Sequence, residues 1–277
     1  MNAAVLRAGW SRGLVELRQS FTNGAELSSH FLWPGLMVAT LFFIRDLPVG
    51  AFMLGALALP GILGMNAATG MIGMSQQLTA DREDGTLLRA KATPYGMPAY
   101  LIGKVISVSG GLLADLVIFL VPAVLLVEGL RIGAGSWPGL AWVLALGLVA
   151  TLPIGAVLGS VFASARAQGL VQLPFLALIG ISGIFYPITS LPEWVQWIAQ
   201  VFPIYWMGLG MRSALLPDSA VAVEIGESWR HLETAGVLGA WAVFGLLVAP
   251  VVLRRMARGE SGSTVAERRE RALRRVG

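Results

Sequence analysis

The chain has no cysteine, only two histidines and few charged residues: Asp, Glu, Lys and Arg make up 13% of its 277 residues. The absence of cysteine excludes disulfides, thiolate metal sites and cysteine nucleophiles. A soluble domain is normally about 25% charged, whereas here 56% of the residues are hydrophobic. One soluble core of this length would not bury that much apolar surface. The composition therefore indicates an integral membrane protein with a single membrane domain.

Long apolar blocks predict six membrane-spanning helices, because about 20 helical residues are needed to cross roughly 30 Å of hydrocarbon. The expected spans are residues 31–44, 49–74, 101–127, 140–163, 169–187 and 232–253. The first block alone reaches only about 21 Å. We therefore expect residues 28–30 or a thinned bilayer to complete that crossing.

An amphipathic helix is expected before the first span. Apolar side chains recur there at spacings of four or three residues and share one helix face; they are Leu6, Trp10, Leu14, Leu17 and Phe21. Such a stripe indicates a helix lying in the membrane interface, and the alternative is a helix packed on soluble protein. We expect one all-α membrane domain over residues 1–253, in which residues 1–27 form this helix and residues 28–253 a six-span bundle.

Positive charge is distributed unevenly over the loops and predicts the orientation. With the N-terminus inside, sixteen Lys and Arg residues lie on the inner side, eight of them in the tail 254–277, and four lie outside. We therefore expect a multi-pass protein of the inner (plasma) membrane with both termini in the cytoplasm. The tail carries +5, from eight Arg and three Glu, so the other 253 residues sum to −1. This favours anionic lipid or an acidic partner over nucleic acid.

The segment 188–230, between the fifth and sixth expected spans, predicts a short element at the outer surface. The run Ser190–Glu193 is typical of a capping box with proline in the first turn of a helix. The tryptophans that follow share one face, and the helix is too short to span. We expect an outer re-entrant helical hairpin, and the alternative is a seventh span. Its expected residues are Pro187, Pro192, Trp194, Trp197 and Pro203.

The sequence contains no phosphate-binding loop and no catalytic arrangement of Ser, His and carboxylates, so we expect no catalytic, metal or cofactor site. Asp115, in contrast, lies deep in the third expected span, about 16 Å past Lys104 along the helix. A carboxylate there costs on the order of 3 kcal/mol, which marks it as a functional candidate. The alternative is a hydrogen bond to another span, for example to Asn66. Gly155 and Gly159 form a G-x-x-x-G that permits close approach of helices.

The loop 76–94 mixes three acidic and three basic residues with a glycine, and suits a short helix presented to a cytosolic partner; the alternative is a solvated turn. In this loop and after the fifth span the sequence resembles the type-2 ABC exporter permeases, the six-helix subunits of daunorubicin-type drug, polysaccharide and lipid exporters. The matching residues are Asp81-Arg82-Glu83, Gly85-Thr86-Leu87, Thr93-Pro94, Gly103-Lys104, the run from Ser182 to Pro187, Leu191-Pro192, Trp194, Pro203 and Met211-Arg212. The sequence departs from the family at Asp81, where Glu is frequent, and at Leu88, which replaces a frequent acid.

This resemblance implies a transport subunit without an ATPase site of its own. Its connecting helix and its loop would dock on a separate ATPase; the implied residues are Leu6, Trp10, Leu14 and Leu17 of the helix and Asp81, Arg82, Glu83, Gly85 and Thr86 of the loop. Two ATPase subunits, which bind ATP and Mg²⁺, and a second permease, either a copy or a paralogue, would complete an exporter of an amphipathic drug-like molecule or lipid.

Candidate residues on the translocation path are Asp115, Asn66, Phe185 and Tyr186. Three alternatives remain at this point. The substrate is a polysaccharide or glycolipid; the chain is a proton-coupled secondary transporter that uses Asp115; or it is a membrane anchor that transports nothing.

Overall fold

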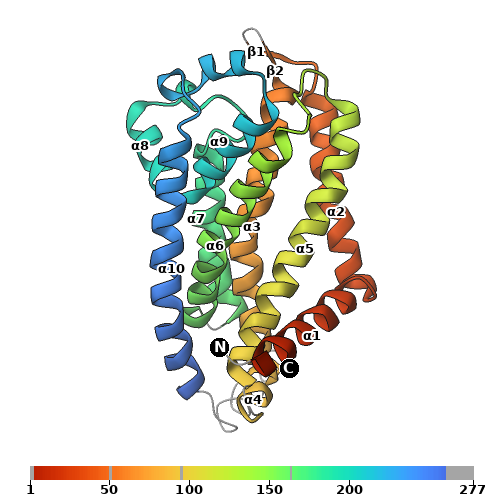
Figure 1. Cartoon of the computed structure of the whole chain (residues 1–277), viewed down its shortest axis with the longest axis vertical. Helices are drawn as coiled ribbons and strands as arrows, with labels where there is room; N and C mark the ends of the chain where they lie inside the picture. The colour runs from red at the N-terminus through yellow and green to blue at the C-terminus, as the bar shows by residue number, and fades with distance from the viewer. Residues whose placement is uncertain (1–2, 50–51, 94–95, 163, 260–277) are drawn as a thin grey trace.

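Long helices that run side by side between two ends make up most of the structure (Figure 1). The computed structural model describes residues 3–49, 52–93, 96–162 and 164–259. The elements in chain order are α1 (Ala3–Ser20), α2 (Gly24–Ile44), β1 (Pro48–Val49), β2 (Phe52–Met53), α3 (Leu54–Glu83), α4 (Thr86–Lys91), α5 (Gly96–Leu126), α6 (Ser136–Val161), α7 (Ala165–Ile181), η1 (Ile188–Ser190), α8 (Glu193–Val201), α9 (Pro203–Leu215), η2 (Asp218–Val223), η3 (Ile225–Glu227) and α10 (His231–Gly259). Pro94 of the expected loop and residues 260–277 of the expected tail lie outside the described residues.

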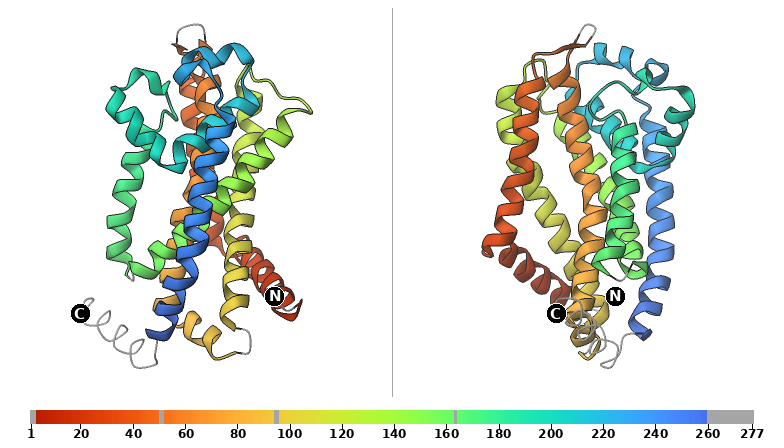
Figure 2. Two further views of the ribbon diagram at one scale, coloured as in Figure 1. Left: turned by 60° about the vertical axis from the view of Figure 1, so that its left-hand side comes forward. Right: turned by 180° about the vertical axis from the view of Figure 1, so that it is seen from behind.

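The two ends of the bundle carry different elements. The lower end in Figure 1 carries α1, α4 and the last turns of α10, and is called the α1/α4 end. The opposite end carries the β1–β2 hairpin, α8 and the 3₁₀ turns, and is called the α8 end. Helices α2, α5 and α7 run from the first end to the second, and α3, α6 and α10 run back (Figure 2).

Within the described residues, five helices are long and apolar enough to cross a membrane: α2 from Glu26 onwards, α3, α5, α6 and α10. The sixth, α7, is apolar but has only 17 residues, a length of about 26 Å. The expected fifth span is too long at its end, because Gly183 at φ +63° turns the chain after Ile181. The chain is thus an all-helical membrane protein, apart from one short hairpin, with five long apolar helices and a shorter one.

The first two expected spans differ in how well their limits were predicted. Helix α2 begins at Gly24, so the polar residues 28–30 do extend the short apolar block. The expected start of the second span at Val49 is wrong, because Val49 pairs with Phe52 in the hairpin and α3 begins only at Leu54. The residue before Pro48 is disfavoured in the α conformation, which helps end the preceding helix.

Helix α3 is the central helix of the bundle. Of its most apolar stretch 83% is buried within the chain, against 39% or less in the other four long helices. Glycines let neighbouring backbones approach it: a Cβ on Gly159 of α6 would lie 2.6 Å from Ser75 O, and one on Gly155 would clash with Met71. The G-x-x-x-G therefore does permit close packing, with α3 as the partner.

Two short helices, α8 and α9, of 9 and 13 residues, lie near the α8 end (Figure 2). Neither is long enough to cross, so the seventh-span alternative is wrong. Trp194 and Trp197 of α8 are exposed, whereas α9 is buried against α3. The predicted capping box is also wrong: Ser190 donates to Pro187 O (2.7 Å), and Pro192 is the N-cap residue of α8.

Candidate functional site

The turn between α3 and α4 is shaped by one glycine. Gly85 is buried and has φ +80°, in the left-handed region that side chains with a Cβ rarely adopt. The Thr86 backbone N–H donates to Asp84 Oδ1 (2.7 Å), which closes the turn. Leu87 and Ala90 of α4 are buried, so the short helix is packed against the bundle. Glu83 and Asp84 remain exposed at the tip.

A buried ion cluster joins this turn to α1 and α5. Lys104 of α5 is 5% exposed, and its Nζ lies 2.8 Å from Asp81 Oδ2 and 2.9 Å from Glu16 Oε2. The Tyr100 hydroxyl donates to the same Asp81 oxygen (2.6 Å). The two carboxylates compensate the charge of the buried Lys104 ammonium group. The contact between α1, α3 and α5 is therefore specific in geometry.

Helix α1 packs on α5 through small residues. A Cβ on Gly9 would lie 2.7 Å from Ile102 Cβ, and one on Gly13 2.7 Å from Gly103 O, so only glycine allows this approach. The predicted apolar stripe lies beside this face: Leu6, Trp10 and Leu14 are exposed. Leu17 is partly buried and lies against Gly110.

The predicted coupling residues therefore fall into two sets. Asp81 and Arg82 point into the protein, since Asp81 belongs to the ion cluster and Arg82 Nη1 donates to Ser160 O at the end of α6 (2.9 Å). Glu83 is exposed, and Thr86 is half-buried with its hydroxyl accepting from Arg89 Nη2 (2.9 Å). Of these four loop residues, only Glu83 and Thr86 are accessible to a partner.

Asp115 has a polar partner in another span, but it is not Asn66. Its Oδ1 lies 2.5 Å from His30 Nδ1 of α2, and the ring of Phe21 stacks on the imidazole with centroids 4.5 Å apart. Both side chains are partly buried, at 13% exposure for His30 and 28% for Asp115. The pair links α2 to α5 close to the corner between α1 and α2.

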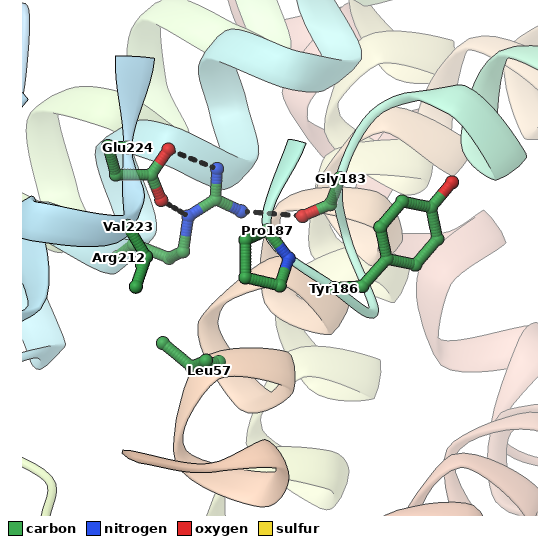
Figure 3. A pocket seen from close by; sticks show the side chains of 7 residues that line it. All are labelled: Leu57, Gly183, Tyr186, Pro187, Arg212, Val223 and Glu224. Carbon is green, nitrogen blue, oxygen red and sulfur yellow. Dashed lines mark hydrogen bonds and ion pairs between the residues drawn. The ribbon is translucent and has the colours of Figure 1, made fainter. Parts of the chain in front are cut away.

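The structure does not bring the four path candidates together. Asn66 is buried on α3. Phe185 and Tyr186 follow α7 at the α8 end, where the Tyr186 hydroxyl donates to Gly180 O. Tyr186 lines a cavity of about 10 Å³ there (Figure 3), which is room for about one water molecule and not for a substrate.

A second buried ion pair borders this cavity. Arg212 of α9 and Glu224, which follows η2, are 3% and 2% exposed, with Nε 2.5 Å from Oε1. Arg212 Nη1 also donates to Gly183 O (3.1 Å), as Figure 3 shows. These contacts hold α9, the η2–η3 segment and the turn after α7 together, so their role is to build the α8 end.

Sequence reasoning missed most partners in these contacts: Glu16, Tyr100 and Lys104 of the ion cluster, His30 of α2, and Glu224 of the outer pair. A signal was present for Lys104 and His30, because a charged or titratable residue beside an apolar run needs a polar partner. The identity of each partner was not readable, since the pairs join residues up to 88 positions apart, as Glu16 and Lys104 do.

A family model described as "ABC-2 type transporter" matches residues 6–216, from α1 through α9. The chain matches no curated protein. An ABC-2 membrane permease domain lacks an ATPase site, and ABC permeases generally pair with ABC ATPase subunits. Because the match covers most of the 277 residues, this chain, a multi-pass membrane permease subunit, belongs to the ABC-2 type transporter family.

Proposed function

We propose that this permease is the membrane subunit of an exporter, and that a separate ABC ATPase docks on its α1/α4 end in the cytoplasm. The observation that carries the proposal is the ion cluster of Glu16, Asp81 and Lys104. A permease without an ATPase site must receive motion through a contact. The cluster fixes α1 and the α3–α4 turn to α5. A displacement of this end is therefore transmitted to α1, α3 and α5 together.

The docking surface consists of the tip of the α3–α4 turn and the connecting helix α1. Glu83 and Asp84 are exposed at the tip, where a basic ATPase groove would pair with them. The exposed stripe of Leu6, Trp10 and Leu14 lies in the lipid interface. Because Glu16 is ion-paired to Lys104 of α5, α1 moves together with α5 when the ATPase changes conformation. Asp81, Arg82 and Gly85 position this surface, and Thr86 lies at its edge.

The assembly that fits these features contains two ATPases, which bind ATP and Mg²⁺, and two permeases, the second a copy or a paralogue. We place the translocation path between the two permeases; the cavity beside Tyr186 is too small to hold a substrate. Both termini face the cytoplasm in the inner membrane, as the excess of Arg at this end favours. Trp194 and Trp197 on exposed α8, with α9 buried behind it, are the arrangement expected of an outer re-entrant hairpin.

The proposed substrate is an amphipathic drug-like molecule or a lipid. Its support is the resemblance of the segments around Glu83 and Pro187 to drug exporters of the daunorubicin type.

The test is Glu83→Arg, with Glu128→Arg, an exposed glutamate between α5 and α6 at the α8 end, as the matched control. Both changes should alter the free energy of unfolding by about 0.5 kcal/mol or less, because both side chains are exposed. A charge pair at a docked surface contributes about 2 to 5 kcal/mol to association. We therefore expect Glu83→Arg alone to lose the ABC ATPase that co-purifies with the tagged wild-type permease from its native membranes.

The measurement is the amount of ATPase recovered per permease in nanodiscs at matched expression, together with ATP hydrolysis. Equal recovery with both variants would show that the tip is a solvated turn. Absence of any ABC ATPase from the wild-type preparation would contradict the proposed assembly itself.

A further inference from the structure

We propose that Arg82 and Gln168 are positioning residues that fasten the α6–α7 turn to the end of α3, so that both mid-chain loops of the α1/α4 end move as one body. The inference deepens the proposed function, on which it rests for the source of the motion. It adds a second route for that motion, from the α3–α4 turn into α6 and α7.

A stripe of polar side chains on α3 is the first observation. Ser75, Thr79 and Arg82 are spaced four and three residues apart and therefore share one helix face. They are 0%, 3% and 8% exposed. Polar groups buried to this degree in a membrane helix require partners inside the protein.

These side chains form hydrogen bonds with the α6–α7 turn. Gln168, in the first turn of α7, is 8% exposed and uses both ends of its amide. Its Oε1 accepts from Ser75 Oγ (2.9 Å), and its Nε2 donates to Thr79 Oγ1 (2.8 Å) and Phe162 O (2.9 Å). The Gln168 side chain thus joins α3 to both sides of the turn, namely the end of α6 and the start of α7.

Arg82 holds the same turn from the other side. Its Nη1 donates to Ser160 O (2.9 Å) and Gly159 O (3.4 Å). These are among the last carbonyls of α6, which have no amide of their own helix to accept from, and a cation is favourable there because of the helix dipole. Gly159 also allows α6 to lie directly against Ser75 of α3.

Two adjacent residues of α3 therefore hold opposite parts of the bundle. Arg82 binds the end of α6, whereas Asp81 binds Lys104 and Tyr100 of α5 and, through Lys104, Glu16 of α1. A displacement imposed on the α3–α4 turn is passed to both sides. Apolar packing would fill the same space, but hydrogen bonds to defined carbonyls select a single register of the turn.

The absence of cysteine from the chain permits a distance measurement with spin labels. Labels at Ala92→Cys and Gly169→Cys report the separation of α4 from α7; both positions are exposed, and a Cβ at Gly169 meets no atom within 4 Å. In nanodiscs, we expect one narrow distance distribution in the wild-type background. Arg82→Met and Gln168→Met should broaden it about twofold, because the fastened turn then opens locally.

The matched control is Arg89→Met, the same change at an exposed arginine of α4. It should leave the distribution narrow, and Arg82→Lys, which keeps the charge, should give an intermediate width. If Arg82→Met does not insert into the membrane, the distance measurement is made with Gln168→Met alone, because that change alters neither the charge nor the approximate side-chain volume. Distributions as narrow as the wild type in both variants would overturn the inference, with no ATPase involved.

The second arm uses the complex with the co-purifying ABC ATPase, trapped with ATP and vanadate. A third label, at exposed Arg255→Cys of α10, is the reference. On trapping, we expect the distances from residues 92 and 169 to residue 255 to change together, while the distance between 92 and 169 stays the same. In Arg82→Met, we expect only the distance from residue 92 to residue 255 to change. A wild-type complex in which Ala92 shifts alone would overturn the inference. A wild-type permease that binds no ATPase contradicts the proposed function only, and the first arm then decides whether the turn is fastened.

Discussion

Asp115 lies in α5 with its carboxylate 2.5 Å from the imidazole of His30, and two roles are compatible with that contact. The pair either serves only to join α2 to α5, or it also contributes to the surface that the substrate passes. A joining role affects stability, whereas a path role affects transport in a protein that is still folded. Substitutions of different shape and polarity separate the two.

We expect Asp115→Leu to lower the free energy of unfolding by about 1 to 3 kcal/mol, because it leaves the partly buried imidazole without its partner. Asp115→Asn still hydrogen bonds to His30 and should cost less than about 1 kcal/mol. If Asp115 contributes to the path, Asp115→Asn changes export at normal expression. Thermal unfolding in nanodiscs and an export assay give the two readings.

The control for Asp115→Leu is the double variant with His30→Phe, which replaces the pair with apolar side chains. It should recover most of the lost stability, because neither polar group is then left alone. Wild-type stability and export in both single variants of Asp115 would contradict both roles.

Gly85 permits a second prediction, because another glycine has almost the same backbone conformation. Gly85 has φ +80° and Gly129, in the exposed loop after α5, has φ +83°. Valine at either position should cost on the order of 1 to 3 kcal/mol through backbone strain. Only Gly85→Val should also reduce ATP hydrolysis in the complex with the ATPase, since Gly85 shapes the proposed docking surface.

The measurement compares the unfolding temperature with ATPase recovery and ATP hydrolysis in the complex for Gly85→Val, Gly85→Asn and Gly129→Val. Asparagine tolerates the left-handed region, so Gly85→Asn should retain most of the activity. Equal loss of ATPase binding in both valine variants would assign the effect to reduced stability and not to the turn.

The residue scale also shows what the sequence could predict. The sequence singles out Asp115, Gly85 and Glu83 as candidates, because a charge is rare in a span and the charged loop contains a single glycine next to acidic residues. The direction in which each side chain points did not follow. Asp81 and Glu83 are two residues apart, yet one is ion-paired to Lys104 and the other is exposed, because a helix turns about 200° between them.

At the scale of elements, we expect the attachment of α1 to α5 to depend on the buried ammonium group of Lys104, which lies between Glu16 and Asp81. Lys104→Met would leave Asp81 and Glu16 facing one another without the ammonium group that separates them. Removing one partner of a buried ion pair typically costs about 3 to 5 kcal/mol. We expect a loss of this order, with α1 released from α5, measured by thermal unfolding and by hydrogen exchange of residues 3–20.

Arg7→Met is the control for Lys104→Met, since Arg7 is exposed on the same helix α1. It should change stability by about 0.5 kcal/mol or less. If exchange of α1 is the same in both variants, the glycine contacts to α5 hold the helix alone and the cluster does not couple it.

Helix limits were predicted best where apolar runs meet charged or helix-breaking residues. The main error at this scale concerns Val49, Phe52 and Met53, which continue an apolar run in the sequence but belong to the two paired strands of the hairpin. The burial of α9 was not predictable either, because its sequence is no more apolar than that of α8, whose tryptophans are exposed. It is buried because Gly64 and Gly208 let its backbone contact α3, a tertiary effect.

At the scale of the whole molecule, the long helices alternate in direction between the α8 end and the α1/α4 end (Figure 1). The turn after α3, the start of α7 and the end of α10 lie there together with α1. The loop between α5 and α6 and the segment after α9 lie at the α8 end. Which loops share an end was predictable from the sequence, because successive spans run in opposite directions. The counts of Lys and Arg add the prediction that the α1/α4 end faces the cytoplasm.

The orientation gives the last prediction. Sixteen Lys and Arg residues belong to the predicted inner side and four to the outer side, a bias that normally fixes topology. Reporter fusions at Ala80, Ala165 and Arg275 should therefore report the cytoplasm, and fusions at Gly133 and Ser219 the outside. Ser219 is the decisive position, because it follows the buried α9 and precedes α10. A cytoplasmic signal there would mean that α7 with α8 and α9 does not complete a crossing. The end that carries Glu83 and the end of α10 would then lie on opposite sides of the membrane, and one ATPase surface could not face both.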